Sequence, residues 1–410
     1  MRKFSCRHCG TVLRNKVIDL GFAPPSNAYL QTDQLNTPEL TFPLRLRVCD
    51  NCWLLQTEDF TSADLLFDAN YAYFSSTSRN WLKHAADYVE KVTAAFGLSS
   101  DSHVLEIASN DGYLLKNFVA AQIPCLGVEP TESTASAAEA IGIPVIKEFF
   151  SEKLAHELTQ TGNSFDLVIG NNVFAHVPDI NDFCRGIAHV LKETGVVSLE
   201  VPHVVSLVQG KQFDTIYHEH FSYFSATTIE KIFSAAGLKV FDIEKIPTHG
   251  GSIRVYGCLS HANVEKSDTA YQILEQEGLL GVENLEFYGS LQKDAVATKN
   301  EFLQFLLTAK AKNKRVAAYG AAAKGNTLIN FAGVRRDLLD CVFDAAASKQ
   351  NKYLPGSHIP IFSPDRITEV NYDYLIVLPW NLVVEIKDTL KGTLCENTKI
   401  VTVMPKIEIH

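Results

Sequence analysis

The sequence has no run of about 20 uninterrupted apolar residues, the length that an α-helix needs to cross a membrane. The opening MRKFSCRHCG has basic side chains, but no apolar segment follows them as it would in a signal peptide. The formal net charge is −10, whereas a domain that binds nucleic acid usually carries a basic face. We therefore expect a cytoplasmic protein with neither a membrane nor a nucleic acid as a partner.

The sequence also lacks the features of a disordered chain and of a repeat protein. Of the 410 residues, 46% are hydrophobic and 20% are charged, so the apolar surface is large enough to offset the entropy of the chain. The sequence contains no internal repeat and no low-complexity tract. At about 150 residues per domain, this length corresponds to two or three domains. We predict three, at residues 1–70, 71–262 and 263–410.

The N-terminal part holds four of the nine cysteines, in two Cys-x-x-Cys pairs formed by Cys6 with Cys9 and by Cys49 with Cys52. In a cytoplasmic chain, such pairs indicate a metal site more than disulfides. Four thiolates satisfy tetrahedral Zn²⁺, and a segment this short and loop-rich folds poorly without a staple. We predict a structural zinc site with no catalytic role. His8 is a less favoured ligand, and four buried or redox cysteines are the alternative.

From about residue 101, short apolar strands alternate with amphipathic helices. The predicted strands are residues 103–108, 124–129, 165–170 and 196–201, and the predicted helices include residues 111–122 and 179–192. Continuous apolar strands separated by helices predict a parallel sheet that is covered on both faces. Residues 238–246 and 252–259 then follow each other without a helix, which predicts an antiparallel pair that closes this sheet.

The last part begins with a long helical stretch at residues 267–311 and continues as a smaller α/β unit. Its first strand, residues 315–319, leads into the turn 320–325, and a helix begins at Asn326. Backbone N–H groups at this small-residue turn, together with the charge of Lys324, suit a diphosphate. A tight turn with a surface lysine explains the pattern equally well.

The first strand of the central part ends in the turn Ala108-Ser-Asn-Asp-Gly112, which opens a helix. The next strand ends at Glu129, an acid placed to accept hydrogen bonds from both hydroxyls of a ribose. A full Gly-x-Gly-x-x-Gly is missing, so the spacing favours S-adenosylmethionine (SAM) over NAD, with Glu106 as part of the site. An ordinary strand–helix turn with a capping Asn or Asp is the alternative.

Polar side chains follow two further strands of the central part. Asn171-Asn-Val-Phe-Ala-His176 comes after one, and Tyr217-His-Glu-His220 lies beyond the other. Open α/β sheets bind ligands beyond the carboxyl ends of their strands, and four ionisable side chains in a row are expensive to bury for packing alone. We predict a site that offers a base, an acid and a hydroxyl for an oxyanion. A solvated loop with chance histidines is the alternative.

Together these motifs resemble, along nearly the whole chain, the SAM-dependent sugar C-methyltransferases, which add a branch methyl to C3 of nucleotide-linked 4-keto-6-deoxy sugars. The resemblance rests on the two cysteine pairs and on the segments EIASNDG, NNVFAH, YHEHFSYFS, HGGSIR and YGAAAKGN. It implies an α/β protein with a small N-terminal zinc-binding domain, a central Rossmann-like class I methyltransferase domain and a C-terminal Rossmann-like α/β domain that helps to hold the nucleotide sugar. Ala108 is a departure, because methyltransferases in general often have glycine there.

The resemblance also implies roles for individual residues. His220 is the expected base at C3, and the other expected catalytic residues are Tyr217, Glu219 and His176. The expected cofactor residues are Tyr71, Glu106, Ala108, Asn110, Asp111, Glu129 and Asn171. The expected substrate residues are Asn172, His176, His203, His249, Arg254, Lys324 and Asn326. The expected ligands are SAM, one structural Zn²⁺ and a dTDP- or GDP-linked sugar, bound by a monomer.

Periodicity alone does not decide between His218 and His220 as the base. In an extended strand these two share one face, with Tyr217 and Glu219 on the other, so cooperation between Tyr217 and His220 requires a turn. We expect burial to lower the pKa of His220. The nearby charge of Glu219 should raise the same pKa, so that the net pKa of His220 is near neutrality. Two other functions stay open: O- or N-methyl transfer to a small polar acceptor, and a catalytically inactive zinc-containing binding protein.

Overall fold

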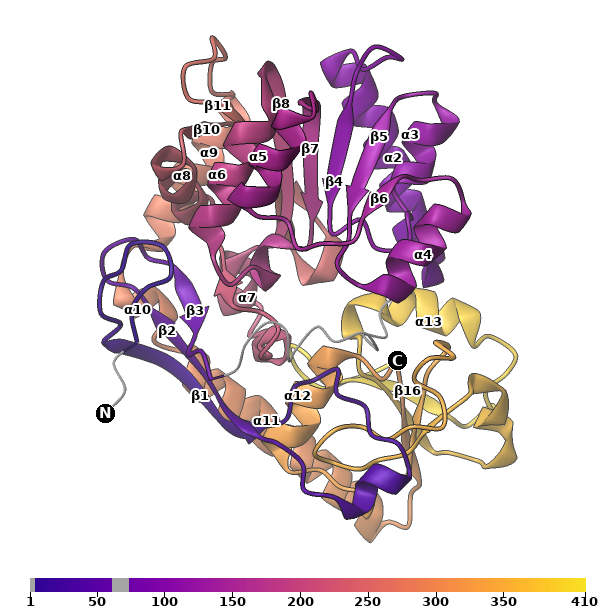
Figure 1. Ribbon diagram of the computed structural model, residues 1–410. Coiled ribbons are helices and arrows are strands. Elements are labelled where there is room, and N and C mark those ends of the chain that lie inside the picture. The colour runs from indigo at the N-terminus through magenta and orange to yellow at the C-terminus, as the bar shows by residue number, and fades with distance from the viewer. Residues whose placement is uncertain (1–3, 61–73) are drawn as a thin grey trace.

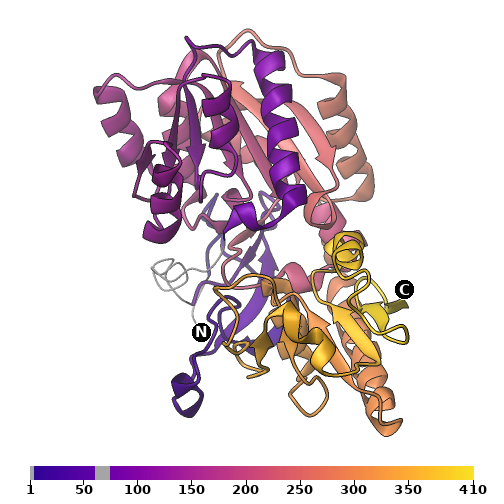
Figure 2. The same ribbon diagram turned by 90° about the vertical axis from the view of Figure 1, so that its right-hand side faces the viewer.

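The structure is a computed structural model that describes residues 4–60 and 74–410, so the expected cofactor residue Tyr71 lies outside the described residues. The strands of these described residues form three sheets. Figure 1 shows the largest sheet in an upper lobe, with the N-terminal strands and the C-terminal unit below it, and Figure 2 shows the same two lobes after a turn of 90°. Within the described ranges, every helix is too short or too polar to cross a membrane.

The strands of the described residues are β1 (Asn15–Ala23), β2 (Phe42–Val48), β3 (Leu55–Thr57), β4 (Val104–Ile107), β5 (Cys125–Val128), β6 (Val145–Ile146), β7 (Phe165–Asn171), β8 (Leu191–Pro202), β9 (Ser222–Tyr223), β10 (Leu238–Ile246), β11 (Ser252–Leu259), β12 (Val316–Tyr319), β13 (Val342–Phe343), β14 (Ile361–Phe362), β15 (Tyr374–Val377), β16 (Lys399–Thr402) and β17 (Glu408–Ile409). The α-helices are α2 (Arg79–Phe96), α3 (Leu115–Ala120), α4 (Glu132–Ala140), α5 (Glu152–Gln160), α6 (Ile180–Val190), α7 (Val204–Gln209), α8 (Ala226–Ala235), α9 (Asp268–Leu280), α10 (Leu285–Tyr288), α11 (Leu291–Ala311), α12 (Ala323–Ala332) and α13 (Val383–Thr389).

The upper lobe is built on a seven-stranded sheet in the order β10-β11-β8-β7-β4-β5-β6. Strands β4 to β8 are parallel, and β11 is antiparallel to both of its neighbours, β8 and β10. The predicted parallel sheet closed by an antiparallel pair is therefore confirmed. Apolar side chains of α5, α6 and α8 pack against one face, and those of α2 and α3 against the other. The loops after the parallel strands face the lower lobe (Figure 1).

The N-terminal part forms an antiparallel sheet in the order β1-β2-β3-β9. Its last strand, β9, comes from the segment directly after His220. The loop that carries the predicted Tyr217–His220 cluster is thus fixed to the N-terminal sheet. A two-residue strand has no detectable period in the sequence, so this pairing was not predictable from the pattern.

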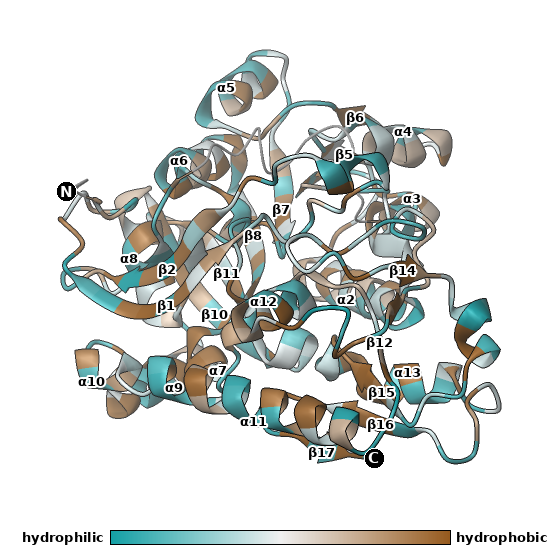
Figure 3. Ribbon diagram, turned by 90° about the horizontal axis from the view of Figure 1, so that it is seen from below, coloured by the Kyte–Doolittle hydropathy of each residue, from teal (hydrophilic) through white to brown (hydrophobic). Residues whose placement is uncertain are grey.

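The N-terminal sheet and the C-terminal unit share one hydrophobic core. It contains the fully buried side chains of Ile18 and Leu46 from the N-terminal sheet, Phe302 and Leu306 from α11, and Ile329 from α12. In Figure 3, hydrophobic colour marks β12 and β15, and the colour is mixed along α11. Mixed colour is expected for a helix that is buried on one side only.

Two helix predictions for the last part were wrong in their boundaries. The stretch 267–311 is three helices, because Gly281 ends α9 in the left-handed conformation (φ 74°). Helix α12 begins at Ala323, three residues early, since alanine and lysine favour a helix. Lys324 therefore lies in the first turn of α12. The tight turn before it needs Gly320, where φ is 87° and a Cβ would lie 2.4 Å from Pro379.

Candidate functional site

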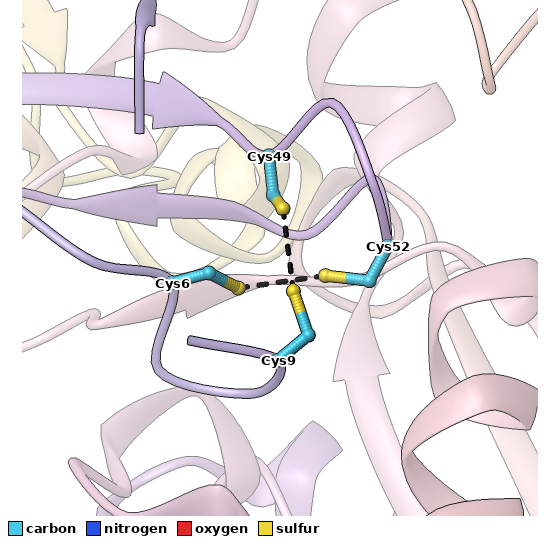
Figure 4. A group of neighbouring side chains, drawn as sticks. All are labelled: Cys6, Cys9, Cys49 and Cys52. Atoms are coloured by element: carbon cyan, nitrogen blue, oxygen red, sulfur yellow. Dashed lines mark hydrogen bonds between the residues drawn. The ribbon is translucent and has the colours of Figure 1, made fainter. Parts of the chain in front are cut away.

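The four predicted zinc ligands converge in the N-terminal part (Figure 4). Their sulfur atoms all lie within 4.8 Å of one another, with 3.4 Å between Cys6 and Cys52 and 3.5 Å between Cys9 and Cys49. Four thiolates at about 2.3 Å from one Zn²⁺ stand about 3.8 Å apart in a tetrahedron, so the group fits a structural zinc ion. Four sulfur ligands leave no open position, which agrees with a structural role.

His8 lies apart from the sulfur cluster. Its Nδ1 is 2.8 Å from Oδ1 of Asn181, and the Asn181 amide donates to the His8 carbonyl at 2.8 Å. Arg7 donates to the carbonyl of Pro178 at 2.9 Å. The first cysteine loop is thereby docked on the segment that follows His176, so His8 contributes to docking and not to the metal site.

Two loops of the upper lobe meet at the predicted cofactor site. The two oxygens of Glu129 accept hydrogen bonds from the N–H groups of Asn110, at 3.0 Å, and Thr131, at 2.9 Å. The carboxylate therefore joins the loop after β4 to the loop after β5. Ala108 and Asn110 have φ values of 57° and 51°, a left-handed conformation that is rare for residues with a side chain and is common at functional sites.

Three buried carboxyl groups, of Glu106, Asp111 and Glu129, lie at the carboxyl ends of β4 and β5. Burial, together with the charges of Glu129 and Asp111, raises the pKa of Glu106 well above its ordinary value. Among the described residues, Glu106 Oε2, Asp111 Oδ1 and Asn171 Oδ1 are buried without a hydrogen-bond partner. Unpaired buried acceptors are costly, and a cationic ligand that carries an ammonium group and hydroxyls would satisfy them. This group of acceptors therefore fits SAM.

The predicted catalytic residues meet beyond β7 and β8. The rings of His176 and His220 have centroids 4.6 Å apart. Nδ1 of His176 donates to the Glu219 carbonyl at 2.6 Å, and Nδ1 of His220 donates to the Thr215 carbonyl at 3.1 Å. Because a carbonyl only accepts, each imidazole holds its proton on Nδ1 and keeps the lone pair on Nε2.

Both imidazoles are neutral near pH 7. Burial lowers the pKa of His176 to about 4. Burial, followed by the neighbouring His176, lowers the pKa of His220 well below its ordinary value. The expectation of a near-neutral pKa for His220 was wrong, because the Glu219 carboxylate bonds to Asn27 and does not offset the burial. A neutral imidazole with a lone pair on Nε2 is able to accept a proton.

The required turn between Tyr217 and His220 is confirmed. The N–H of His220 donates to the Tyr217 carbonyl at 3.0 Å, which closes the turn. The Tyr217 hydroxyl then reaches Nε2 of His220 at 2.8 Å. His218 points elsewhere: its Nε2 lies 3.3 Å from the carbonyl of Phe42, in the N-terminal sheet. The two candidate bases therefore face different parts of the molecule.

Asn172 and His249 are held in unusual backbone conformations near these groups, with a φ of 54° each. Both amide atoms of Asn172 are buried and lack a partner in the part of the chain that the structure describes. The ring of His249 meets the ring of Trp81 edge-on at 5.4 Å. Burial, and then the charge of Lys324, lowers the pKa of His249 to about 4. The unpartnered amide of Asn172 and the neutral ring of His249 are the polar groups that this region leaves without strong protein partners among the described residues.

Lys324 joins the C-terminal unit to this region. Its Nζ donates to Oδ1 of Asn381 at 2.8 Å and lies 5.0 Å from the ring centroid of Trp380. The indole N–H of Trp380 donates to Oδ2 of Asp214 at 2.8 Å. Burial lowers the pKa of Lys324, and the charge of Asp214 opposes this effect. The charge of Lys324 is among the causes that lower the pKa of His220, so this ammonium group acts on the histidine site.

Arg254 and His203 have protein partners. Arg254 Nη2 donates to Oε2 of Glu200 at 2.6 Å, and His84 lies 2.9 Å from the same oxygen. Burial opposes ionisation of Glu200, but the hydrogen bond from His84 and the charge of Arg254 lower its pKa to about 2. His203 contacts Glu277 on α9 at 2.7 Å, beside a cavity of about 410 Å³. Neither side chain joins the contacts of His176 and His220 described above.

Several residues of this region were not found from the sequence: Asn27, Trp81, His84, Asp214, Trp380 and Asn381. The only signal was the rarity of tryptophan, since the chain has three. His84 lies on α2, and Asp214 lies three residues before Tyr217. Asn27 and Asn381 come from parts of the chain that are far from Tyr217 in sequence. No spacing rule identifies these residues as part of the site.

Comparison with known proteins agrees with the methyltransferase fold and with the zinc site. The chain matches a C-methyltransferase C-terminal domain over residues 247–405, a zinc-binding domain over residues 6–67 and a methyltransferase domain over residues 80–243. It is 31% identical over 401 residues to the C-methyltransferase NovU of Streptomyces niveus, which covers 98% of this chain and 95% of that protein.

Many solved structures are similar over part of the chain. A SAM-dependent methyltransferase from Clostridium acetobutylicum is 16% identical and covers 43% of this chain and 92% of its own, with a TM-score of 0.36. The PH0226 protein of Pyrococcus horikoshii is 13% identical and covers 49% of this chain and 100% of its own, with a TM-score of 0.37. On the identity to NovU and the three domain matches, the chain belongs to the SAM-dependent C-methyltransferases that carry an N-terminal zinc-binding domain.

Proposed function

We propose that this C-methyltransferase acts on C3 of a nucleotide-linked 4-keto-6-deoxy sugar, through an enolate that His220 generates. One observation carries the proposal: the neutral imidazoles of His176, partly buried, and His220, buried, have ring centroids 4.6 Å apart, and the hydroxyl of Tyr217 lies 2.8 Å from Nε2 of His220. A C–H group next to a ketone loses its proton only where a base and donors for the enolate oxygen are both in place. Transfer to oxygen or nitrogen needs a much weaker base.

The roles of the side chains follow from their protonation. The Tyr217 hydroxyl occupies the Nε2 lone pair of His220, so an entering sugar displaces this hydrogen bond. Nε2 then takes the proton from C3, and the electron pair of the C–H bond moves toward the oxygen on C4. The hydroxyl of Tyr217 and the amide of Asn172 are the donors for that oxygen. Bound SAM supplies an activated methyl group on its sulfonium, for which the enolate carbon is the acceptor.

The cofactor is held, in this proposal, by the loops that follow β4 and β5. Glu129 accepts the ribose hydroxyls on the lone pairs that Asn110 and Thr131 leave available. Glu106 and Asp111 offer buried acceptors to the positive end of SAM. The backbone around Ala108 stays close to the cofactor, and Asn171 contributes its unpaired oxygen. Tyr71 is kept as a cofactor residue on the family resemblance.

We propose that the nucleotide end of the substrate binds at the C-terminal unit, near Lys324. The ammonium group of Lys324 lowers the pKa of both His220 and His249. A diphosphate beside Lys324 would cancel much of that positive charge and raise the pKa of His220 as the substrate binds. The base would thus gain strength when its substrate is present. We further propose that the sugar is dTDP- or GDP-linked. It is held between three domains, at residues 1–70, 71–262 and 263–410.

The experiment that tests this function uses SAM with an isotopically labelled methyl group and a panel of dTDP-, GDP-, UDP- and CDP-linked 4-keto-6-deoxy sugars. Mass spectrometry and NMR should find one labelled methyl on C3 of at least one sugar. In deuterated water without SAM, the C3 proton of that sugar should exchange. Label on oxygen or nitrogen, without exchange at C3, would favour the alternative acceptor class. No transfer to any member of the panel would overturn the sugar assignment.

A further inference from the structure

A short segment of the N-terminal part, residues 24–29, lies against the first turn of α12. Its first two residues are prolines, which fix the backbone φ at the entry. The Tyr29 hydroxyl donates to the Ala321 carbonyl at 2.6 Å, and the Asn326 side chain donates to the Ser26 carbonyl at 2.6 Å. The segment is therefore anchored on both sides of its centre. Asn326, expected to bind substrate, is buried and holds this segment in place.

The centre of the segment is Asn27, which contacts Glu219. The backbone N–H and the side-chain Nδ2 of Asn27 both donate to Oε1 of Glu219, each at 3.1 Å. Glu219 is fully buried, and its Oε2 has no hydrogen-bond partner among residues 4–60 and 74–410. Two donors on one oxygen leave that oxygen no room for a proton, so a proton on this carboxyl group has to lie on Oε2.

We infer that Asn27 is a positioning residue of the methyl-transfer site, which fixes Oε1 of Glu219 so that Oε2 is the oxygen that holds a proton or meets the ligand. The inference rests on the proposed function, because it gives Glu219 a part in that reaction. Burial raises the pKa of Glu219, which favours the protonated form. A neutral carboxyl group with its O–H on a known oxygen is a directed donor for developing negative charge.

The titratable groups around Glu219 come from three elements. Tyr29 lies on the same segment as Asn27, and Tyr223 lies on β9; the charge of Glu219 acts on both phenols. His176 donates to the Glu219 carbonyl. Hydrogen bonds from Asn27 lower the pKa of Glu219 and oppose the effect of burial. Removal of a donor from Asn27 therefore raises the pKa of Glu219, whichever protonation form is the active one.

The test compares four variants of the full-length, zinc-loaded protein. Asn27→Ala removes the side-chain donor, and Asn27→Asp replaces it with an acceptor of the same shape. Glu219→Gln removes the titrating carboxyl group. The limb of the kcat-against-pH profile that disappears in this variant is therefore the Glu219 limb. Asn36→Ala is the matched control, since Asn36 is an exposed asparagine of the same N-terminal part. Each variant is assayed at saturating SAM and sugar, with melting temperature and zinc content measured on the same sample.

We expect Asn27→Ala to lower kcat about tenfold or more, since misplaced groups lose rate before they lose binding. The KM for SAM should change less than threefold. The Glu219 limb should move to higher pH by about one unit, and further in Asn27→Asp. Asn36→Ala should match the wild-type protein in every measurement.

Two results would overturn the inference. The first is an unmoved Glu219 limb in Asn27→Ala and Asn27→Asp while the melting temperature and zinc content stay at wild-type values. The second is a loss of folding or of zinc in both variants, which would assign Asn27 a structural role only. A wild-type kcat and pH profile in Glu219→Gln would instead remove Glu219 from the proposed function. This result does not depend on any Asn27 variant, so it separates failure of the proposed function from failure of the inference about Asn27.

Discussion

The hydroxyl of Tyr217 lies 2.8 Å from Nε2 of His220 and donates a hydrogen bond to it. The donor and the base are three residues apart and meet only because the segment turns. Since Nδ1 of His220 is held by the Thr215 carbonyl, the ring cannot rotate without losing a buried hydrogen bond. The pair is thus arranged before any ligand arrives.

Removal of the Tyr217 hydroxyl tests its part in stabilising the enolate. Tyr217→Phe keeps the ring and the base, so we expect substrate binding to stay within threefold of wild type. The rate should fall about 10²–10³-fold, the usual effect of removing one oxyanion donor. Steady-state kinetics give both values. A fall in binding with an unchanged kcat would show that the hydroxyl serves the ground state instead.

The zinc site predicts a difference between cysteines. Cys49→Ser should lose the zinc ion and lower the melting temperature, because the metal ties two loops of a sheet that helps to hold the candidate catalytic loop. Cys395→Ser is the control, since Cys395 is exposed and lies outside the cluster. Metal analysis should give one zinc per chain for the wild type and for Cys395→Ser. A folded, fully active protein without metal would contradict this account.

Some features of the fold and of the site could be predicted from the sequence, and others could not. The cysteine pairs and the strands were predictable, because a motif or an apolar run lies within a few consecutive residues. The contact between Asn27 and Glu219 joins residues 192 positions apart, and the contact between Trp380 and Asp214 joins residues 166 positions apart. No periodicity spans such distances, since these contacts arise from the packing of the lobes.

The pKa of His220 could not be predicted from the sequence for the same reason. The sequence placed Glu219 next to it, which suggested a charge that raises the pKa of the base. In the fold, the turn sends the Glu219 carboxylate toward Asn27, and burial with His176 dominates. Neighbours in sequence therefore do not determine which charges act on a buried group.

Glu129 is expected to bind the ribose of SAM. Glu129→Ala should weaken SAM binding at least tenfold, because each lost hydrogen bond to the carboxylate contributes about 1.5–3 kcal/mol at most. It also removes the acceptor that joins the loops at Asn110 and Thr131. Calorimetric titration measures the change, with Glu132→Ala as a control, since Glu132 is an exposed acid three residues later. Equal affinity in wild type and Glu129→Ala would remove Glu129 from the cofactor site.

Lys324 is expected to set the pH range of the base. Its charge is one cause of the low pKa of His220, so Lys324→Met raises that pKa. A base that works in its neutral form loses activity as the pH falls through its pKa, so the acid limb of kcat/KM should move to higher pH. Affinity for the nucleotide sugar should fall about tenfold or more with loss of the charged contact. Lys314→Met, an exposed lysine paired with Asp373, should change neither. An acid limb that stays in place would separate Lys324 from the base.

The most direct test of the account measures exchange of the C3 proton for deuterium in the absence of SAM, in His220→Ala and in His218→Ala. His218 is the matched control, because it lies two residues away and contacts the Phe42 carbonyl of the N-terminal sheet. Loss of a general base lowers a rate about 10²–10⁴-fold. We predict that exchange falls by this factor in His220→Ala, although both substrates still bind. In His218→Ala we predict exchange near the wild-type rate. Wild-type exchange in His220→Ala, or its loss in His218→Ala alone, would contradict the assignment of the base.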